Sequence, residues 1–279
     1  MSAPRGGRAL LRRLPGAVSL HARWTAARVR RRRQWQWERA HTCVVSFPKS
    51  GRTWLHVMLA RLARGAQAPF VLDVPGVLFT HDDADKPALP LRADFDRYAE
   101  RKVVLLVRDP RDVLVSYFAH RTRRDRTYEG TLAAFVREPG YGAERIVAFL
   151  SAWWRHRAVP RGFLLVRYED LHAAPRKELE RIARFLGLPH GGAELEEAAA
   201  FGAFERMAER ERAGAFADTR LRPGGAGDPE SYKVRRGEVG GWIAALAPED
   251  AAWVTAVMAR TLPAELGYRA HVPAIGWDE

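Results

Sequence analysis

The 279-residue sequence has very little cysteine, since Cys43 is the single thiol in the chain. An internal disulfide is therefore excluded, and such low usage is typical of a reducing compartment, so we expect a cytoplasmic protein. Long apolar runs are also missing, because no stretch approaches the roughly 20 residues that span a bilayer. The sequence contains no internal repeat. A chain of this length is expected to form one large or two small globular domains with an ample core.

Acidic residues are scarce at the N-terminus. Residues 1–40 contain eleven Arg and one acid, Glu38, so this segment has +10 of the overall charge of +13 and leaves +3 for the rest. We therefore divide the chain into a basic extension, 1–40, and a folded domain, 41–279. A solvated tail is the favoured interpretation of the extension. An organelle-targeting peptide and a weak peripheral membrane contact remain alternatives, whereas no nucleic-acid partner is expected because the domain itself is nearly neutral.

The sequence from Thr42 to Trp54 predicts an anion-binding loop. An apolar, β-branched run ends in Pro48-Lys49-Ser50-Gly51, and a helical pattern follows. A strand, a tight loop and a helix together aim backbone N–H groups at an anion. Gly51 permits close approach of the backbone, Lys49 adds a positive charge, and Ser50 and Thr53 add hydroxyl donors. The loop is not a Walker A loop, in which the Lys follows the second Gly, because Lys49 precedes Gly51.

Apolar runs and helical patterns alternate along the rest of the chain. The clearest strand is 102–107, and others are expected at 77–80 and 163–168. The expected helices are 110 to the basic stretch 121–126, then 132–138, 143–157, 175–186, 193–212 and 248–261. This alternation predicts an α/β fold, with a single domain built on a central parallel β-sheet flanked by helices.

His81 follows the short strand 77–80 directly and is a candidate base. The alternative is a hydrogen-bonded histidine that closes a loop. Asp82 and Asp83 come next, and they are either loop acids or substitutes for His81 as the base.

Arg108 follows the strand 102–107, at the end of a parallel sheet where ligands bind. The sequence predicts that Asp109 caps the next helix and that Pro110 occupies its first turn. A structural ion pair of Arg108 with Asp109 or Asp112 explains the arginine equally well.

Taken together, these motifs resemble the sulfotransferases that use 3′-phosphoadenosine 5′-phosphosulfate (PAPS), over roughly residues 42–270. Pro48 to Trp54 is similar to the family's 5′-phosphosulfate loop, PKSGTTW, with Arg52 where Thr or Asn is usual. The segment from Arg108 through Ser116 resembles the motif in which the first Arg and the later Ser hold the 3′-phosphate. Thr80-His81 is similar to the Thr-His pair whose His is the catalytic base.

Further segments resemble the rest of the family's nucleotide site. Tyr168-Glu169-Asp170 is similar to YED, whose Tyr lies near the adenine, and Gly240-Gly241-Trp242 is similar to GDW. The resemblance also implies stacking of Trp54 on adenine. The nucleotide-binding residues that it implies are Lys49, Ser50, Gly51, Arg52, Thr53, Trp54, Arg108, Ser116, Tyr168, Phe204, Met207, Arg235, Arg236 and Gly237.

The resemblance implies in-line transfer of a sulfuryl group from PAPS to a hydroxyl or amine, with adenosine 3′,5′-bisphosphate (PAP) as the product and no metal. Lys49 would stabilise the leaving phosphate, and His81 would take the acceptor's proton, since the reference pKa of histidine, near 6.5, makes the neutral form available at cellular pH. Residues 232–242 contain three basic residues and three glycines, a composition typical of a lid over an anion or of a solvated turn.

Other functions remain open at this point. A P-loop kinase or hydrolase shares the strand–loop–helix site, and a non-catalytic protein could bind nucleotide, nucleic acid or a membrane. The acceptor is a small molecule, a carbohydrate or a lipid; the basic stretch 121–126 permits an acidic or carbohydrate acceptor but also suits a solvated helix end. The sequence does not define the oligomeric state.

Overall fold

The computed structural model describes residues 31, 34–216, 218, 221 and 237–268. Contacts divide the chain into two compact units, Met1–Arg39 and Ala40–Glu279. Residues 34–39 of the first unit are helical. Everything below concerns the second unit.

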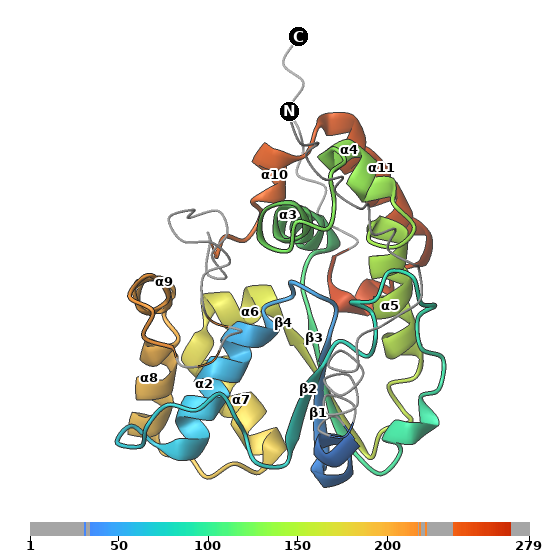
Figure 1. Ribbon diagram of the computed structural model, residues 1–279. Coiled ribbons are helices and arrows are strands. Elements are labelled where there is room, and N and C mark those ends of the chain that lie inside the picture. The colour runs from blue at the N-terminus through green and yellow to red at the C-terminus, as the bar shows by residue number, and fades with distance from the viewer. Residues whose placement is uncertain (1–30, 32–33, 217, 219–220, 222–236, 269–279) are drawn as a thin grey trace, which may run out of the picture. The chain divides into compact units, whose positions relative to one another are not determined.

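Four parallel strands form the sheet, in the order β2-β1-β3-β4 (Figure 1). The strands are β1 (Thr42–Ser46), β2 (Val77–Thr80), β3 (Lys102–Val107) and β4 (Gly162–Arg167). The predicted central parallel sheet is thus confirmed. All of β1 and most of β3 are buried, as apolar runs of this kind require. The chain leaves β1 toward β2 on one side and later returns to β3 on the other, so a switch point lies between β1 and β3.

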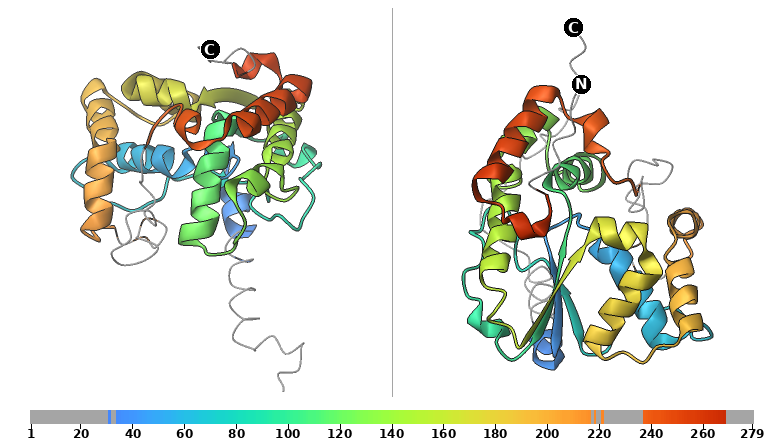
Figure 2. Two further views of the ribbon diagram at one scale, coloured as in Figure 1. Left: turned by 90° about the horizontal axis from the view of Figure 1, so that it is seen from above. Right: turned by 180° about the vertical axis from the view of Figure 1, so that it is seen from behind.

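Helices cover both faces of the sheet (Figures 1 and 2). One face carries α2 (Arg52–Arg64), α7 (Pro175–Leu186) and α8 (Gly192–Phe201), and the other carries α5 (Ala143–Arg155) and α11 (Pro248–Thr261). The remaining helices are α3 (Pro110–Ala119), α4 (Leu132–Arg137), α6 (Tyr168–Ala173), α9 (Phe204–Arg212) and α10 (Trp242–Ala245), and short 3-10 turns lie at Asp96–Tyr98 and Ala264–Leu266.

Local sequence signals predicted the start of α3 correctly. The Asp109 carboxylate accepts the backbone N–H of Arg111 at 2.9 Å, and Pro110 opens α3, so both predictions for this helix start are confirmed. The helix does not continue as an α-helix through the basic stretch, however. It ends at Ala119 and is followed by a π-helical turn, His120–Arg124.

Two predicted element bounds are wrong. The expected helix 193–212 is two helices, α8 and α9, with a break at Gly202. The Trp54 indole donates a hydrogen bond to the Gly202 carbonyl at 2.6 Å, and a Cβ at Gly202 would lie 2.4 Å from Cγ of Met58. Close packing against α2 therefore fixes the break. Tyr168, expected at the end of a strand, instead begins α6.

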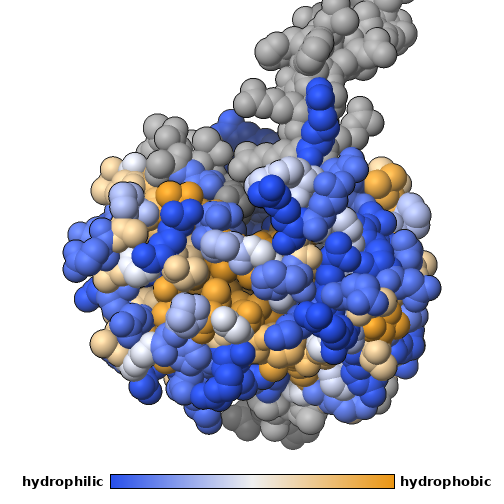
Figure 3. All heavy atoms as spheres, turned by 90° about the horizontal axis from the view of Figure 1, so that it is seen from below, coloured by the Kyte–Doolittle hydropathy of each residue, from blue (hydrophilic) through white to orange (hydrophobic). Residues whose placement is uncertain are grey.

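The main apolar core lies between the sheet and α2, α7 and α8. On the surface, the face in Figure 3 shows hydrophilic residues around its rim and apolar side chains near its centre. Among the described helices, none combines the length and the apolar composition needed to cross a membrane. The rigid core holds the carboxyl ends of β1, β2 and β3 in place, and the loops that leave these ends build the site.

Candidate functional site

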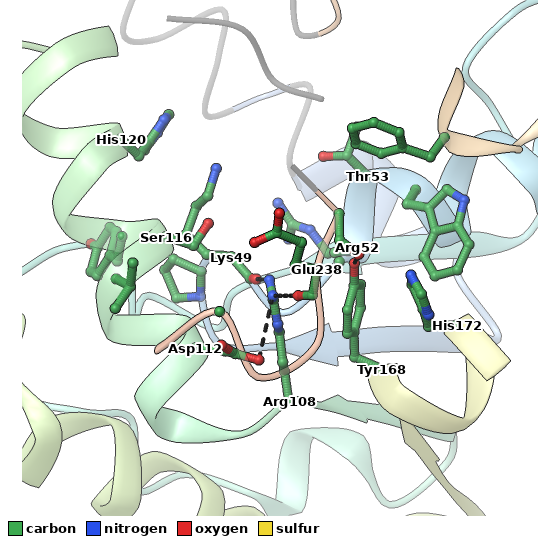
Figure 4. A pocket seen from close by; sticks show the side chains of 18 of the residues that line it. Lys49, Arg52, Thr53, Arg108, Asp112, Ser116, His120, Tyr168, His172 and Glu238 are labelled. Carbon is green, nitrogen blue, oxygen red and sulfur yellow. Dashed lines mark hydrogen bonds and ion pairs between the residues drawn. The ribbon is translucent and has the colours of Figure 1, made fainter. Parts of the chain in front are cut away.

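A pocket of about 350 Å³ opens at the carboxyl ends of β1 and β3 (Figure 4). Its walls come from the loop after β1, the start of α2, the end of β2, helix α3 and segments around residues 168, 204 and 237. Segments that are far apart in sequence therefore meet at the switch point, where open α/β sheets bind ligands. Of the predicted site residues, those that line the pocket are Lys49, Gly51, Arg52, Thr53, Trp54, His81, Arg108, Ser116, Tyr168, Phe204, Met207 and Gly237.

The loop after β1 has an unusual backbone. Lys49 has φ 71° and Gly51 has φ 91°, so two of its residues are left-handed. Gly51 caps α2, and a Cβ there would lie 2.5 Å from Cδ2 of Tyr168. Only glycine fits this position. The first turn of α2 contains no acid, so its positive end faces the pocket without a carboxylate of its own helix.

Ser50 differs from its neighbours in this loop because it does not line the pocket. Its side chain is buried, and Oγ makes no hydrogen bond among the described residues. A direct contact of Ser50 with a bound anion stays a prediction.

Arg108 joins two walls of the pocket. Nη1 donates to the Lys49 carbonyl at 3.4 Å, and Nη2 donates to the Glu238 carbonyl at 2.7 Å. The guanidinium carbon lies 4.2 Å from the centre of the Tyr168 ring. Nη2 also lies 3.7 Å from the Asp112 carboxylate, so Arg108 forms an ion pair and faces the pocket at once. The alternative pairing with Asp109 is wrong, because that carboxylate engages Arg111.

Asp112 fastens the segment 237–242 to α3. Its two carboxylate oxygens accept the backbone N–H groups of Gly240 at 2.8 Å and Trp242 at 3.0 Å. Burial raises the pKa of Asp112, against the lowering effects of Arg108 and the two N–H groups. Sequence reasoning treated Asp112 only as a partner for Arg108. Its position four residues after Arg108, one helical turn away, was the signal for a shared role.

Aromatic side chains form one end of the pocket. The rings of Trp54 and Tyr168 meet edge to face with centroids 5.6 Å apart, and the Tyr168 hydroxyl donates to the Gly237 carbonyl at 3.2 Å. A Cβ at Gly237 would lie 2.5 Å from the Phe204 ring. The predicted residues Arg235 and Arg236, and the part of the predicted lid before Gly237, lie outside the described residues.

His81 lines the pocket at the end of β2. Its Nδ1 lies 2.9 Å from the Ser46 carbonyl oxygen. A carbonyl can only accept, so Nδ1 bears the hydrogen, and in the neutral ring the lone pair is on Nε2. This tautomer is the one that a base acting through Nε2 needs.

The two acids after His81 are held in a separate network. Asp82 accepts from the Tyr98 hydroxyl at 2.7 Å and pairs with Arg92 at 3.0 Å. Asp83 pairs with the same arginine at 2.6 Å. Burial raises the pKa of Asp82; burial also acts upward on the pKa of Asp83, but its cationic partners, Arg92 among them, lower it overall. Neither acid lines the pocket, so the geometry favours His81 over both.

The sequence pointed to only part of a polar wall of the pocket, the basic stretch 121–126. This wall consists of Asp85, Tyr117, His120, Arg121 and Asp125, and we call it the distal wall. Figure 4 shows His120 on the opposite side of Lys49 and Ser116 from Tyr168 and His172. The available signal was helical periodicity, because His120 follows Ser116 by one turn. Among the described residues, no three metal-ligating side chains gather into a cluster.

Comparisons with known proteins give a consistent result. The sulfotransferase domain family matches residues 97–264. Sulfotransferase 4A1 from mouse, rat and human is 31% identical over 182 residues, which cover 55% of this chain and 62% of the relative. Cytosolic sulfotransferase 10 from Arabidopsis thaliana is 29% identical over 63% of this chain and 52% of its own length. The chain thus spans less than two thirds of these relatives.

Solved structures share the fold. Mouse sulfotransferase SULT7A1 complexed with PAP matches with a TM-score of 0.57 and 20% identity, over 80% of this chain and 84% of that protein. Retinol dehydratase in complex with androsterone and the inactive cofactor PAP matches with a TM-score of 0.58 and 18% identity, over 78% and 79% of the respective chains.

Proposed function

The chain belongs to the sulfotransferase domain family, and on this premise we propose that it transfers a sulfuryl group from PAPS to a hydroxyl or amine of a small-molecule, carbohydrate or lipid acceptor. PAP in the two structural neighbours supports this nucleotide. The cytosolic names of plant relatives support a cytoplasmic location.

The observation that carries the proposal is the joining of two anion-binding elements in one pocket. The loop around Lys49 and Gly51 opens α2, and Arg108 hydrogen-bonds directly to the Lys49 carbonyl. An anion at the helix N-terminus and a second anion at Arg108 and Ser116 fit a nucleotide with phosphates at both its 5′ and 3′ positions. Trp54 and Tyr168 line the end where a base would pack.

In this proposal bound PAPS supplies the sulfuryl group. As the acceptor oxygen bonds to sulfur, Nε2 of His81 takes the acceptor's proton. As the bond between sulfur and the phosphate oxygen breaks, Lys49 neutralises the charge left on that oxygen, and backbone N–H groups at the start of α2 hold the neighbouring oxygens. Arg52, the first residue of α2, also lines the pocket and adds a positive charge beside these N–H groups.

Nucleotide binding gives the first test. Titration calorimetry should show PAP binding to the intact protein far more tightly than ATP, because ATP lacks a 3′-phosphate for Arg108 and Ser116. A preference for ATP with magnesium would instead identify a kinase or hydrolase and overturn the proposal.

Lys49→Ala gives the second test. We expect kcat for transfer from PAPS to fall about 10²–10³-fold, the usual cost of losing one group that stabilises developing charge. Lys177→Ala, an exposed lysine on α7, is the matched control and should transfer normally. Equal rates for the two variants would refute the role of Lys49.

His81→Ala tests the base and should lower kcat about 10²–10⁴-fold. His190 offers a close control, because its Nδ1 also bonds a backbone carbonyl, that of Leu188 at 2.8 Å, at a position outside the pocket. A full rate in His81→Ala would assign proton removal to another group.

A further inference from the structure

The distal wall indicates what kind of acceptor the pocket receives. Resting on the function proposed above, we propose that the acceptor is a neutral, polyhydroxylated molecule of the carbohydrate class, bound through its hydroxyls to Asp85, His120, Arg121 and Asp125. The proposal concerns the side of the pocket away from Trp54 and Tyr168.

The position of the wall makes it the acceptor side. His81, the proposed base, and Lys49 line the same pocket as the wall. Figure 4 places His120 across Lys49 from Tyr168, at the other end from the proposed nucleotide base. We therefore assign the wall to the group that receives sulfate.

Hydrogen bonds and ion pairs hold the side chains of the distal wall in place. Arg121 donates to the Asp85 carbonyl and to the Tyr117 hydroxyl, each at 3.1 Å, and pairs with Asp125 at 3.3 Å. Its guanidinium also lies 5.2 Å from the centre of the Tyr117 ring. Nε2 of His120 lies 3.3 Å from the same Asp125 carboxylate. One carboxylate thus holds both an imidazole and a guanidinium at the pocket surface.

The chemistry of this wall disfavours an apolar acceptor. Among the described residues that line the pocket, the aliphatic ones are Pro48, Val115 and Met207, and none of them belongs to the distal wall. A flat aromatic ring or a steroid would strip water from Asp125 and Arg121 and return no hydrogen bonds, which is costly. The Tyr117 ring, also part of the wall, offers little compensation because it is almost fully buried.

The charge balance disfavours an anionic acceptor. Two acidic residues, Asp85 and Asp125, line the pocket with Arg121, the one arginine of the distal wall. The guanidinium is already engaged by a carboxylate, a carbonyl and a phenol. A hydroxyl group both donates and accepts, so adjacent hydroxyls can satisfy a carboxylate and a cation together. A sugar presents hydroxyls in that arrangement.

An acceptor panel tests the proposal with the intact protein and PAPS. The acceptors are a methyl hexopyranoside, a disaccharide, 4-nitrophenol and a 3-hydroxysteroid, and PAP binding is measured separately by calorimetry. We expect kcat/KM for a sugar to exceed that for the phenol and the steroid by about a hundred-fold or more, since sites built to hydrogen-bond a hydroxyl reject analogues that lack it. Transfer that favours the phenol or steroid, or that reaches neither sugar, overturns the proposal. Absence of PAP binding would overturn the sulfotransferase function itself.

Two variants of the wall sharpen the test. Asp125→Leu removes the shared carboxylate, and His120→Phe replaces a polar ring with an apolar one of similar shape. Each should lower kcat/KM for the sugar about ten-fold or more and raise it for 4-nitrophenol, with PAP affinity retained as evidence of an intact fold. Asp94→Asn, an exposed acid outside the pocket, is the control and should behave as wild type. An unchanged ratio of sugar to phenol in both wall variants would refute the assignment.

Discussion

Asp112→Asn is the substitution for which the structure gives the most definite expectation. The carboxylate is 3% exposed and accepts two backbone hydrogen bonds, from Gly240 and Trp242. Asparagine has nearly the same shape but one accepting oxygen, so one bond is lost and one buried N–H faces an amide nitrogen. Hydrogen bonds to a charged group contribute about 1.5–3 kcal/mol each, so we expect about 2–3 kcal/mol of lost stability.

The same substitution should weaken nucleotide binding. Gly237, Glu238 and Gly241 line the pocket, and Asp112 holds the segment that contains them. With one of the two hydrogen bonds to this segment lost, we expect PAP affinity to fall about ten-fold, which corresponds to about 1.4 kcal/mol. Urea unfolding, with and without PAP, measures both effects on one protein.

Asp73→Asn is the matched control. Asp73 lies 3.7 Å from Arg64, the same distance that separates Asp112 from Arg108, but its side chain is 56% exposed. Exposed pairs contribute about 0–1 kcal/mol, so this variant should unfold close to wild type. Similar, small losses in the two variants would show that Asp112 does not anchor the segment.

The pH dependence of the Asp112 effect has a definite sign. Burial raises the pKa of Asp112 above its ordinary value, so the folded state binds this proton more tightly than the unfolded state. Its contribution is therefore most favourable below the unfolded pKa and falls as pH rises through the interval up to the raised pKa. Asp112→Asn cannot titrate, so the loss of stability relative to wild type should be greatest at acid pH and shrink across that interval. A loss that grows with pH would contradict the shift.

Two further predictions concern the loop and the cysteine. Gly51 and Gly187 both have a left-handed backbone, with φ 91° and 74°, but a Cβ at Gly51 meets the Tyr168 ring at 2.5 Å whereas nothing lies within 4 Å at Gly187. Alanine at Gly187 should cost about 1–2 kcal/mol in urea unfolding, as backbone strain alone does, and alanine at Gly51 should cost more and also weaken PAP binding; equal effects would exclude the ring contact as the cause. Cys43 is fully buried and burial raises its pKa to about 12, so a thiol reagent at pH 8 should label it only at the rate of unfolding, and fast labelling of the folded protein would refute this.

The features that the sequence predicted are those whose cause is local. The run from Lys102 to Val107 is apolar and β-branched, and it forms β3 with the predicted bounds. Asp109 and Pro110 start a helix through their own backbone chemistry. The predicted helix 175–186 forms α7 with these bounds, and Gly187 follows it with φ 74°, a left-handed conformation that suits glycine after a helix.

The features that the sequence missed have distant causes. The break between α8 and α9 depends on the hydrogen bond from Trp54 to Gly202, across 148 positions of the chain. Tyr168 begins a helix in contact with Gly51 and Arg108, neither of which is near it in sequence. The pattern of apolar residues within either segment gives no indication of these contacts.

The same distinction separates the loop before α2 from the distal wall. The proposed anion site at the start of α2 is a contiguous loop, so its glycine and lysine are visible in the sequence. The distal wall depends on Arg121 reaching Asp85, 36 positions earlier, and on the π-helical turn that follows α3. An ordinary α-helix through residue 126, as the sequence suggested, would have placed the side chains of this stretch at different angles. The polarity of the distal wall is therefore a property of the fold, and charge counts along residues 121–126 could not define it.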